Sequence, residues 1–257
     1  SCVGSNKWLI PAKFEIFAIL SNPDRKYIWV EKQPLSSAEN LNECQRILDS
    51  LQSSGHIDDF TISLLKADLL CSQNTNESVS EADQIYEDLL KSKEKIPIAC
   101  MTGHARCLMR FEEYDRAEKI LNNVLLGKPF HEDIGYFEES YLMMAHIISN
   151  KKNFTSSQHF LFLALELNMC CKKAWEMSAT VHMKNKMYNE ASTAYGRLWD
   201  LCDHNDPEIG YNYAFCSMKA KKFDVAMLVC REVLTISPNY KNIQQEVLIP
   251  SYKQIKM

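Results

Sequence analysis

Glycine and proline are scarce in this sequence, with seven and eight residues among 257, and this scarcity disfavours an all-β fold rich in tight turns. No apolar run approaches the roughly 20 residues that a membrane-spanning helix requires, and the start of the chain lacks a signal-peptide pattern. The net charge of −4 is not that of a typical nucleic-acid-binding protein. We therefore expect no direct membrane insertion and no nucleic-acid partner.

The motifs of common catalytic and cofactor sites are also missing. The sequence contains no G-x-S-x-G, Walker loop, H-E-x-x-H or dinucleotide-binding glycine pattern, and its seven histidines are scattered. Cys202 and His204 offer two metal ligands, but no second pair follows at zinc-site spacing. The sequence thus predicts no catalysis, no cofactor, no metal and no small-molecule ligand.

Ten cysteines are present, but none of them forms a C-x-x-C pair. The vicinal Cys170 and Cys171 could be redox-active, although we favour a helix boundary with one thiol exposed. Several others fall on apolar helical faces, where a free thiol packs like a small hydrophobic side chain in a reducing compartment. These are Cys44, Cys107, Cys216 and Cys230. We therefore expect reduced cysteines and a cytoplasmic protein.

What the sequence does contain is a repeat, clearest between Cys171 and Ser237. A small residue is followed after nine positions by an aromatic one and after three more by a second small residue, with a period near 34 that is typical of the tetratricopeptide repeat (TPR). Each TPR unit is a pair of antiparallel helices, A and B, and the small residues lie where the two helices cross. The matched positions are Ala179 with Ala214, Tyr188 with Phe223, Ala191 with Ala226 and Leu198 with Val233.

Extended upstream, the pattern predicts an all-α fold, a right-handed TPR α-solenoid of about five helical hairpins with flanking helices. Tyr114, Phe154, Tyr188 and Phe223 each open a B helix, and the long step from Tyr114 to Phe154 indicates a longer loop between two repeats. The predicted hairpins are 58–71 with 80–92, then 97–126, 135–168 and the two within 171–237. Ser72–Val79 is expected to be a long exposed loop in the first of them.

We divide the chain into three parts. Residues 1–36 hold an N-terminal helix and an extended connector, residues 37–238 hold the TPR-like repeats, and residues 239–257 hold a C-terminal capping helix that Pro250 should kink or shorten. The chain starts at Ser1 without an initiator methionine, which favours a fragment of a longer protein or numbering that begins after processing.

Two surface features are candidates for partner binding. On the last A helix, Tyr211, Phe215 and Met218 form an apolar stripe suited to a partner helix, unless the solenoid's own packing or the terminal helix covers it. The turns from helix A to helix B carry lysines that would contact an acidic partner, unless they only form a solvated edge that matches the helix dipole. These lysines are Lys151, Lys152, Lys184, Lys186, Lys219, Lys221 and Lys222, and turns on the opposite edge carry Asp200, Asp203, Asp206 and Glu208.

Several segments go beyond the general repeat pattern. The most specific are Asn205-Asp206-Pro207-Glu208-Ile209-Gly210-Tyr211, Ala214-Phe215 and Lys219-Ala220-Lys221-Lys222-Phe223. Three further segments lie upstream, at Cys170–Glu176, Phe137–Tyr141 and Ile96–Ala99. Together these segments resemble the C-terminal repeats of the tetratricopeptide repeat protein 21 family.

This resemblance implies a non-catalytic scaffold. The family supplies the large TPR subunit of intraflagellar transport complex A, which acts in retrograde ciliary transport and ciliary cargo trafficking. The resemblance implies other subunits of that complex as partners, and the cilium and ciliary base as the location. The alternative is a general TPR adaptor that binds a short peptide or a partner helix in its concave groove.

Overall fold

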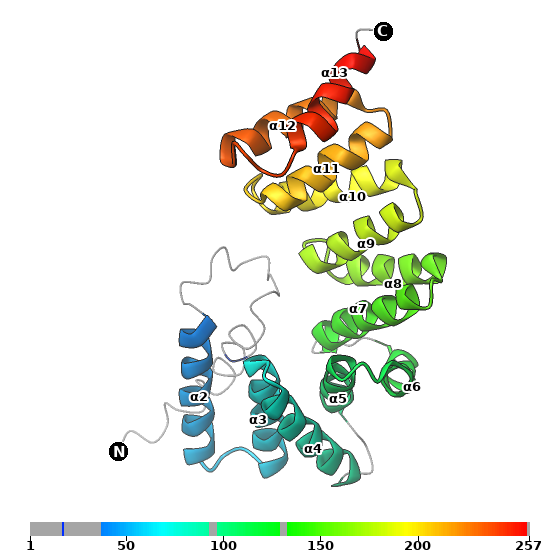
Figure 1. Ribbon diagram of the computed structural model, residues 1–257. Coiled ribbons are helices and arrows are strands. Elements are labelled where there is room, and N and C mark those ends of the chain that lie inside the picture. The colour runs from blue at the N-terminus through cyan, green and yellow to red at the C-terminus, as the bar shows by residue number, and fades with distance from the viewer. Residues whose placement is uncertain (1–16, 18–36, 93–96, 129–132, 256–257) are drawn as a thin grey trace. The chain divides into compact units, whose positions relative to one another are not determined.

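The computed structural model of the chain describes residues 17, 37–92, 97–128 and 133–255, and all regular structure among them is helical (Figure 1). The chain divides into two compact units, which we call unit 1 (Ser1–Met143) and unit 2 (Met144–Met257). The predicted N-terminal helix and connector lie outside the described residues except for Phe17, which is helical and buried against α2 and α3.

In unit 1, each helix packs mainly against the next one along the chain. α3 pairs with α4 and α5 pairs with α6, as the period predicts, and α2 packs on α3. The helices are α2 (Ser37–Ser53), α3 (Asp59–Gln73), α4 (Asn76–Ser92), α5 (Ile98–Arg110) and α6 (Tyr114–Leu125), followed by α7 (Ile134–Asn150), which begins in unit 1 and ends in unit 2.

Unit 2 continues the pattern with α9 packed on α10 and α11 packed on α12. Its helices after α7 are α8 (Phe154–Leu167), α9 (Lys172–Lys184), α10 (Tyr188–Leu201), α11 (Pro207–Lys219) and α12 (Phe223–Ile236), and the chain ends in a π-helical turn η2 (Gln244–Leu248) that runs into α13 (Ile249–Ile255). The four aromatic residues predicted to open B helices are the first residues of α6, α8, α10 and α12, which confirms the repeat.

Small residues lie at the crossing of every hairpin, as predicted. Each has 0% of its surface exposed, because the backbones of the two helices approach closely at that point. In the α7–α8 hairpin the B-helix residue is Ser157, whose hydroxyl donates a 2.8 Å hydrogen bond to the carbonyl of Ala145 and is thereby satisfied. The residues are Ala67 with Ala82, Ala105 with Ala117, Ala145 with Ser157, Ala179 with Ala191 and Ala214 with Ala226.

The prediction of a long loop at Ser72–Val79 is wrong. α3 runs to Gln73 and α4 begins at Asn76, so only Asn74 and Thr75 separate them. Asn74 takes a left-handed conformation with φ 57°, and the Thr75 hydroxyl accepts a 3.1 Å hydrogen bond from the backbone N–H of Ser78. The polar residues that suggest a loop therefore cap the two helices instead.

Close packing explains why one of the family-like residues, Gly210, is a glycine. A Cβ atom at this position would lie 2.8 Å from the indole ring of Trp199 and 2.4 Å from the side chain of Val233. The Trp199 ring is 1% exposed and fills the space beside the α11 backbone, while its N–H donates to Glu232 at 3.1 Å. Glycine is therefore required by sterics at the start of α11.

The C-terminal segment covers the end of unit 2. Ile243 and Val247 are buried in a core cluster with Trp199, Val229 and Val233. The π-helical turn ends at Leu248, two residues before Pro250. Because proline lacks an N–H and its ring crowds the carbonyl one turn earlier, a wider turn is expected at this place.

The turns from helix A to helix B share a backbone feature that the sequence did not predict. Glu112, Lys152, Lys186 and Lys221 each stand two residues before the B helix, and each has a left-handed φ of 59–62°. The next N–H bonds back five residues in every case, for example from Met187 to the carbonyl of His182 at 2.9 Å. This is the Schellman ending of a helix, which usually places glycine at the left-handed position.

Replacing Lys186 by glycine should therefore stabilise the protein. The left-handed conformation costs a residue with a Cβ about 1–2 kcal/mol, and the extra freedom of glycine in the unfolded chain offsets part of this gain. We expect the free energy of unfolding to rise by about 0.5–1 kcal/mol in urea denaturation followed by circular dichroism. Lys184→Gly, at the last residue of α9 where the backbone is still helical, should lower it by up to about 1 kcal/mol. A loss of stability in Lys186→Gly would contradict the strain argument.

Candidate interaction surfaces and a buried polar network

The predicted lysines all lie exposed on the turns from helix A to helix B in unit 2, and we call this set the lysine edge. It comprises Lys151, Lys152, Lys184, Lys186, Lys219, Lys221 and Lys222. Within the described part of the chain, none of Lys184, Lys186, Lys221 and Lys222 makes an ion pair, whereas Lys219 lies 5.3 Å from the centre of the Phe215 ring. Most of this charge is therefore directed to solvent or to a partner.

The helix dipole accounts for only part of the lysine edge. Lys184 and Lys219 are the last residues of α9 and α11, where a positive charge interacts favourably with the dipole. Lys222 immediately precedes α12, where a positive charge is unfavourable. In unit 1 the equivalent of Lys186 and Lys221 is Glu112, so the turn itself does not require a lysine.

Several acidic residues of unit 2 make hydrogen bonds or ion pairs within the protein, unlike most of the lysines. The carboxylate of Asp206 accepts hydrogen bonds from the N–H groups of Glu208 and Ile209 and caps α11. Asp200 lies 3.3 Å from the ring nitrogen of His204, and Glu208 lies 3.7 Å from the amine of Lys241. These acids therefore contribute to helix capping and to local charge balance.

The apolar stripe on α11 is half-buried at all three of its residues, Tyr211, Phe215 and Met218. The rings of Tyr211 and Phe215 stack with their centres 6.4 Å apart. The C-terminal segment engages Tyr211, because Tyr240 packs edge-on to it and the Tyr211 hydroxyl donates a hydrogen bond to Glu246. Phe215 and Met218 pack against the core cluster that contains Ile243 and Val247. Neither has a ring contact or hydrogen bond to the described part of the C-terminal segment.

Charged groups border the stripe. The amine of Lys241 lies 5.0 Å from the centre of the Tyr211 ring, a cation–π arrangement. Burial raises the pKa of Tyr211 to about 12, and the carboxylate of Glu246 adds to this effect. Tyr211 therefore stays a neutral hydrogen-bond donor and links α11 to the C-terminal segment.

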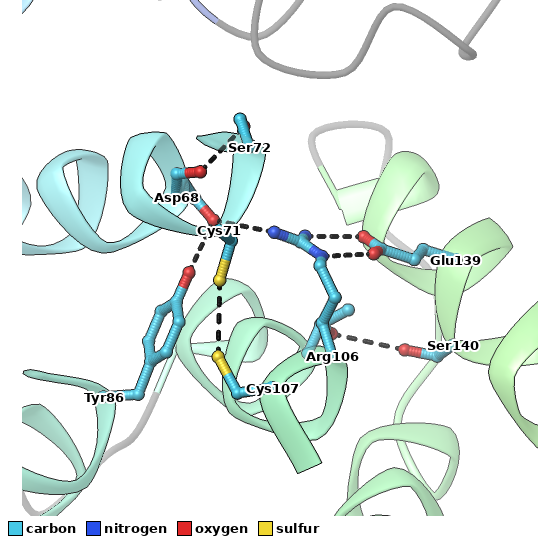
Figure 2. A network of polar contacts seen from close by, with 9 residues as sticks. Asp68, Cys71, Ser72, Tyr86, Arg106, Cys107, Glu139 and Ser140 are labelled. Atoms are coloured by element: carbon cyan, nitrogen blue, oxygen red, sulfur yellow. Dashed lines mark hydrogen bonds and ion pairs between the residues drawn. The ribbon is translucent and has the colours of Figure 1, made fainter. Parts of the chain in front are cut away.

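A largely buried polar network in unit 1 joins side chains from several helices (Figure 2). Arg106 of α5 forms a two-pronged ion pair with Glu139 of α7, with N–O distances of 2.5 and 2.8 Å. Its third nitrogen donates to Asp68 of α3 at 3.2 Å. The hydroxyl of Tyr86 from α4 donates to the same carboxylate oxygen at 2.7 Å. One guanidinium therefore connects four helices, directly or through Asp68.

Electrostatics favour this arrangement despite the cost of burial. Burial disfavours a charged guanidinium, but the Glu139 carboxylate outweighs it and raises the pKa of Arg106 well above its usual value. Burial also raises the pKa of Asp68, although Arg106 and the Tyr86 hydroxyl pull it down. The side chains of Arg106, Asp68 and Glu139 are only 31%, 17% and 23% exposed. Each charge thus depends on its partners, which makes the network structural.

Sequence reasoning did not single out Arg106. The available signal was weak, because the residue directly follows the crossing residue Ala105 and is a charged side chain inside an otherwise mainly small and apolar helix. Its partners lie up to 38 residues away along the chain, so no local pattern identifies them.

The cysteines behave largely as predicted. Cys171 precedes α9 and its sulfur accepts a hydrogen bond from the N–H of Ala174, while Cys170 is half-buried. Burial raises the pKa of Cys44 to about 11 and that of both Cys216 and Cys230 to about 12, so they remain thiols. Cys107 is also fully buried, but its sulfur lies 3.3 Å from that of Cys71, a pairing that spacing does not predict.

Other chemically capable residues are committed to packing. The His204 ring stacks on Trp199 with 5.3 Å between ring centres. No group of three or more His, Cys, Asp or Glu side chains gathers in a metal-binding arrangement among the described residues. A helix long and apolar enough to cross a membrane is likewise absent from that part of the chain.

One buried histidine lacks a close partner. His104 of α5 is 4% exposed, neither of its ring nitrogens makes a hydrogen bond to the described residues, and its Nε2 atom lies 3.8 Å from the Asp83 carboxylate. Burial lowers the pKa of His104 below its ordinary value of 6.5, against the attraction of Asp83. The folded protein therefore favours the neutral ring.

Comparison with known proteins adds sequence evidence to this geometry. A family model described as the tetratricopeptide repeat protein 21 C-terminal ARM domain matches residues 43–251. The tetratricopeptide repeat protein 21 homolog of Caenorhabditis elegans is 26% identical over 94% of this chain and 19% of its own length. Tetratricopeptide repeat protein 21B of Homo sapiens is 27% identical over 66% of this chain and 13% of its own length. The chain thus spans less than a fifth of the length of these two relatives.

A solved structure shows the same kind of fold. YrrB, described as a TPR protein with an unusual peptide-binding site, superposes with a TM-score of 0.55 at 15% sequence identity. The match covers 81% of this chain and 97% of YrrB. At this identity the likeness supports the TPR architecture alone.

Removing Arg106 should destabilise the protein strongly. Arg106→Ala leaves Asp68 and Glu139 as partly buried carboxylates without their cation, and we expect the free energy of unfolding in urea to fall by about 2–4 kcal/mol. Arg106→Lys keeps the charge but loses the two-pronged geometry, so an intermediate loss is expected. Arg110→Ala, at an exposed position of the same helix, should change stability by less than about 0.5 kcal/mol. Equal effects at positions 106 and 110 would refute the role of the network.

Stability should fall with acidification between pH 7.5 and 5.5. Because the pKa of His104 is lower in the folded protein, the unfolded chain binds the proton first as pH falls through 6.5, and stability present above that pH is lost. The pKa values of His146 and His182 are also lowered, chiefly by burial, and they act in the same direction. His104→Gln should flatten the dependence of the melting temperature on pH, whereas His56→Gln, at an exposed position, should leave it unchanged. A parallel dependence in wild type and His104→Gln would show that His104 does not contribute.

Proposed function

The chain belongs to the tetratricopeptide repeat protein 21 family, and on that premise we propose that it is a non-catalytic scaffold subunit of intraflagellar transport complex A. In this role it acts in retrograde ciliary transport and in the trafficking of ciliary cargo, in the cytoplasm, at the ciliary base and in the cilium. Its partners are other subunits of that complex. The observation that carries the proposal is the family match, because residues 43–251 take in every described TPR-like hairpin.

The lysine edge is the surface through which we propose that the scaffold contacts an acidic partner. Its lysines are exposed, four of them make no ion pair in the described part of the chain, and the helix dipole explains only those at the ends of α9 and α11. Lys152, Lys186 and Lys221 recur at one position of successive turns and accept a strained backbone there. A repeated positive charge of this kind complements a row of carboxylates on another protein.

A second candidate function is a peptide-binding adaptor. Phe215 and Met218 of α11 are half-buried rather than covered, which suits a short amphipathic partner helix. Against it, the C-terminal segment already occupies one end of the stripe through Tyr240 and Glu246. The scaffold function therefore has the better support.

The decisive experiment is affinity purification from ciliated cells with quantitative mass spectrometry. The wild-type chain should recover the other large solenoid subunits of the complex. Charge reversal of Lys219, Lys221 and Lys222 to Glu should reduce that recovery about tenfold or more and weaken its dependence on salt concentration, because the attraction is between opposite charges. A matched control reverses Arg197, Arg231 and Lys253 to Glu, which are exposed basic residues within helices of the same unit, and should retain binding.

The outcomes separate the two functions. Recovery of no transport-complex subunit by the wild-type chain would reject the scaffold. Equal losses in the two charge-reversal variants would reject the lysine edge but not the scaffold. A partner that is lost in Phe215→Ser and kept in the Lys219/Lys221/Lys222 variant would instead support the peptide-binding adaptor.

A further inference from the structure

We propose that Cys71 and Cys107 are a reversible redox site, in which hydrogen peroxide converts the facing thiols into a disulfide between α3 and α5. The Sγ atoms lie 3.3 Å apart and belong to residues 36 positions apart in the sequence. Figure 2 shows the two sulfurs directed toward each other beside Arg106. This site is independent of the proposed transport function, because it depends only on contacts inside unit 1.

The geometry needs little movement to form a bond. A disulfide has a sulfur–sulfur distance of about 2.05 Å, so the two atoms must approach by about 1.2 Å from their present contact. α3 and α5 already contain residues whose Cα atoms lie within 8 Å of each other. Cys71 is half-buried whereas Cys107 has no exposed surface, so a small oxidant reaches Cys71 first.

The surrounding charges favour Cys71 as the attacking thiolate. Either thiol can donate the hydrogen bond between the two sulfurs. With Cys107 as the donor, this bond lowers the pKa of Cys71; the Arg106 guanidinium adds to the effect, whereas burial and Asp68 oppose it. The same hydrogen bond raises the pKa of Cys107, together with burial. Cys71 is thus the more acidic thiol of the pair and Cys107 the less acidic one, and the more acidic thiol is the one that reacts as a thiolate.

The chemistry balances in two steps. The Cys71 thiolate attacks the O–O bond of hydrogen peroxide, takes one oxygen to form a sulfenic acid and releases hydroxide, which is protonated to water. The Cys107 sulfur then attacks the Cys71 sulfur, loses its proton and displaces hydroxide, which leaves as a second water. Two electrons pass from the thiols to the peroxide, and a dithiol reductant reverses the reaction by thiol–disulfide exchange.

Four other cysteines of the described residues lack this combination of features. Cys44, Cys100, Cys216 and Cys230 are buried, and burial raises the pKa of each of them to about 11 or 12. Oxidation at the pair has a structural consequence as well. It ties α3 covalently to α5 beside Arg106 and so acts on the network that holds Glu139 of α7.

The test is oxidation of the reduced full chain at pH 7 with graded hydrogen peroxide. Peptide mapping without reductant should show a cross-link between Cys71 and Cys107 before any other cysteine changes, with a decrease of about 2 Da that dithiothreitol reverses. In Cys107→Ser, Cys71 should instead accumulate a sulfenic acid that dimedone labels. Cys71→Ser should abolish both products.

A matched pair of variants tests the hydrogen bond itself. Cys107→Ser keeps a donor to the Cys71 sulfur and Cys107→Ala removes it, so dimedone labelling of Cys71 should be several-fold slower in Cys107→Ala. Circular dichroism verifies that each variant is folded. If a variant is not folded, the cross-link found by peptide mapping of the oxidised wild-type chain tests the proposal instead. The proposal is overturned if Cys170 and Cys171 or any other cysteines oxidise first, or if Cys71 reacts no faster than Cys100.

Discussion

The close approach of the two helices of each hairpin is the constraint on which the rest of the structure depends. At every crossing a side chain no larger than serine is fully buried, and a larger one would push the backbones apart. This contact sets where helix B starts, and hence where its opening aromatic residue and the preceding turn lie. The turn lysines of unit 2 and the aromatic stripe of α11 take their positions from these crossings. The surfaces that we assign to partners are thus a consequence of packing at small residues.

Unit 1 adds a polar element to this apolar scheme. Arg106, Asp68, Tyr86 and Glu139 satisfy one another, so the cost of burying three charges is offset by ion pairs and a hydrogen bond. Apolar side chains pack in many registers, whereas a two-pronged guanidinium–carboxylate pair accepts only one geometry. We interpret the network as a device that fixes the alignment of α3, α4, α5 and the start of α7. The thiols of Cys71 and Cys107 meet at its side and are held by the same alignment.

The function that we propose for this chain depends on exposed surfaces. The engaged acids of unit 2 cap helices and balance local charge, as Asp206 does for α11. The lysine edge is different. Only Lys184 and Lys219 match a helix dipole, at the ends of α9 and α11, whereas three of the other lysines have a strained left-handed backbone. Such a surface has little effect on stability and a large effect on which partner associates and how fast. That division fits a scaffold, in which small residues build the solenoid and exposed charges select the neighbour.

The sequence alone determined the helical hairpins, their crossing residues and the aromatic residue that opens each B helix from Tyr114 onward, because these follow a period that is local and repeated. It also placed the lysines on the turns. It misjudged Ser72–Val79, where side-chain capping by Thr75 turned an apparent loop into the ends of two helices. Tertiary structure decided the left-handed turns, since their occupants are lysine and glutamate rather than the glycine that would signal them. It alone brought Arg106 to Asp68 and Cys71 to Cys107, because contacts across 36 to 38 residues depend on how neighbouring hairpins stack and leave no periodic trace in the chain.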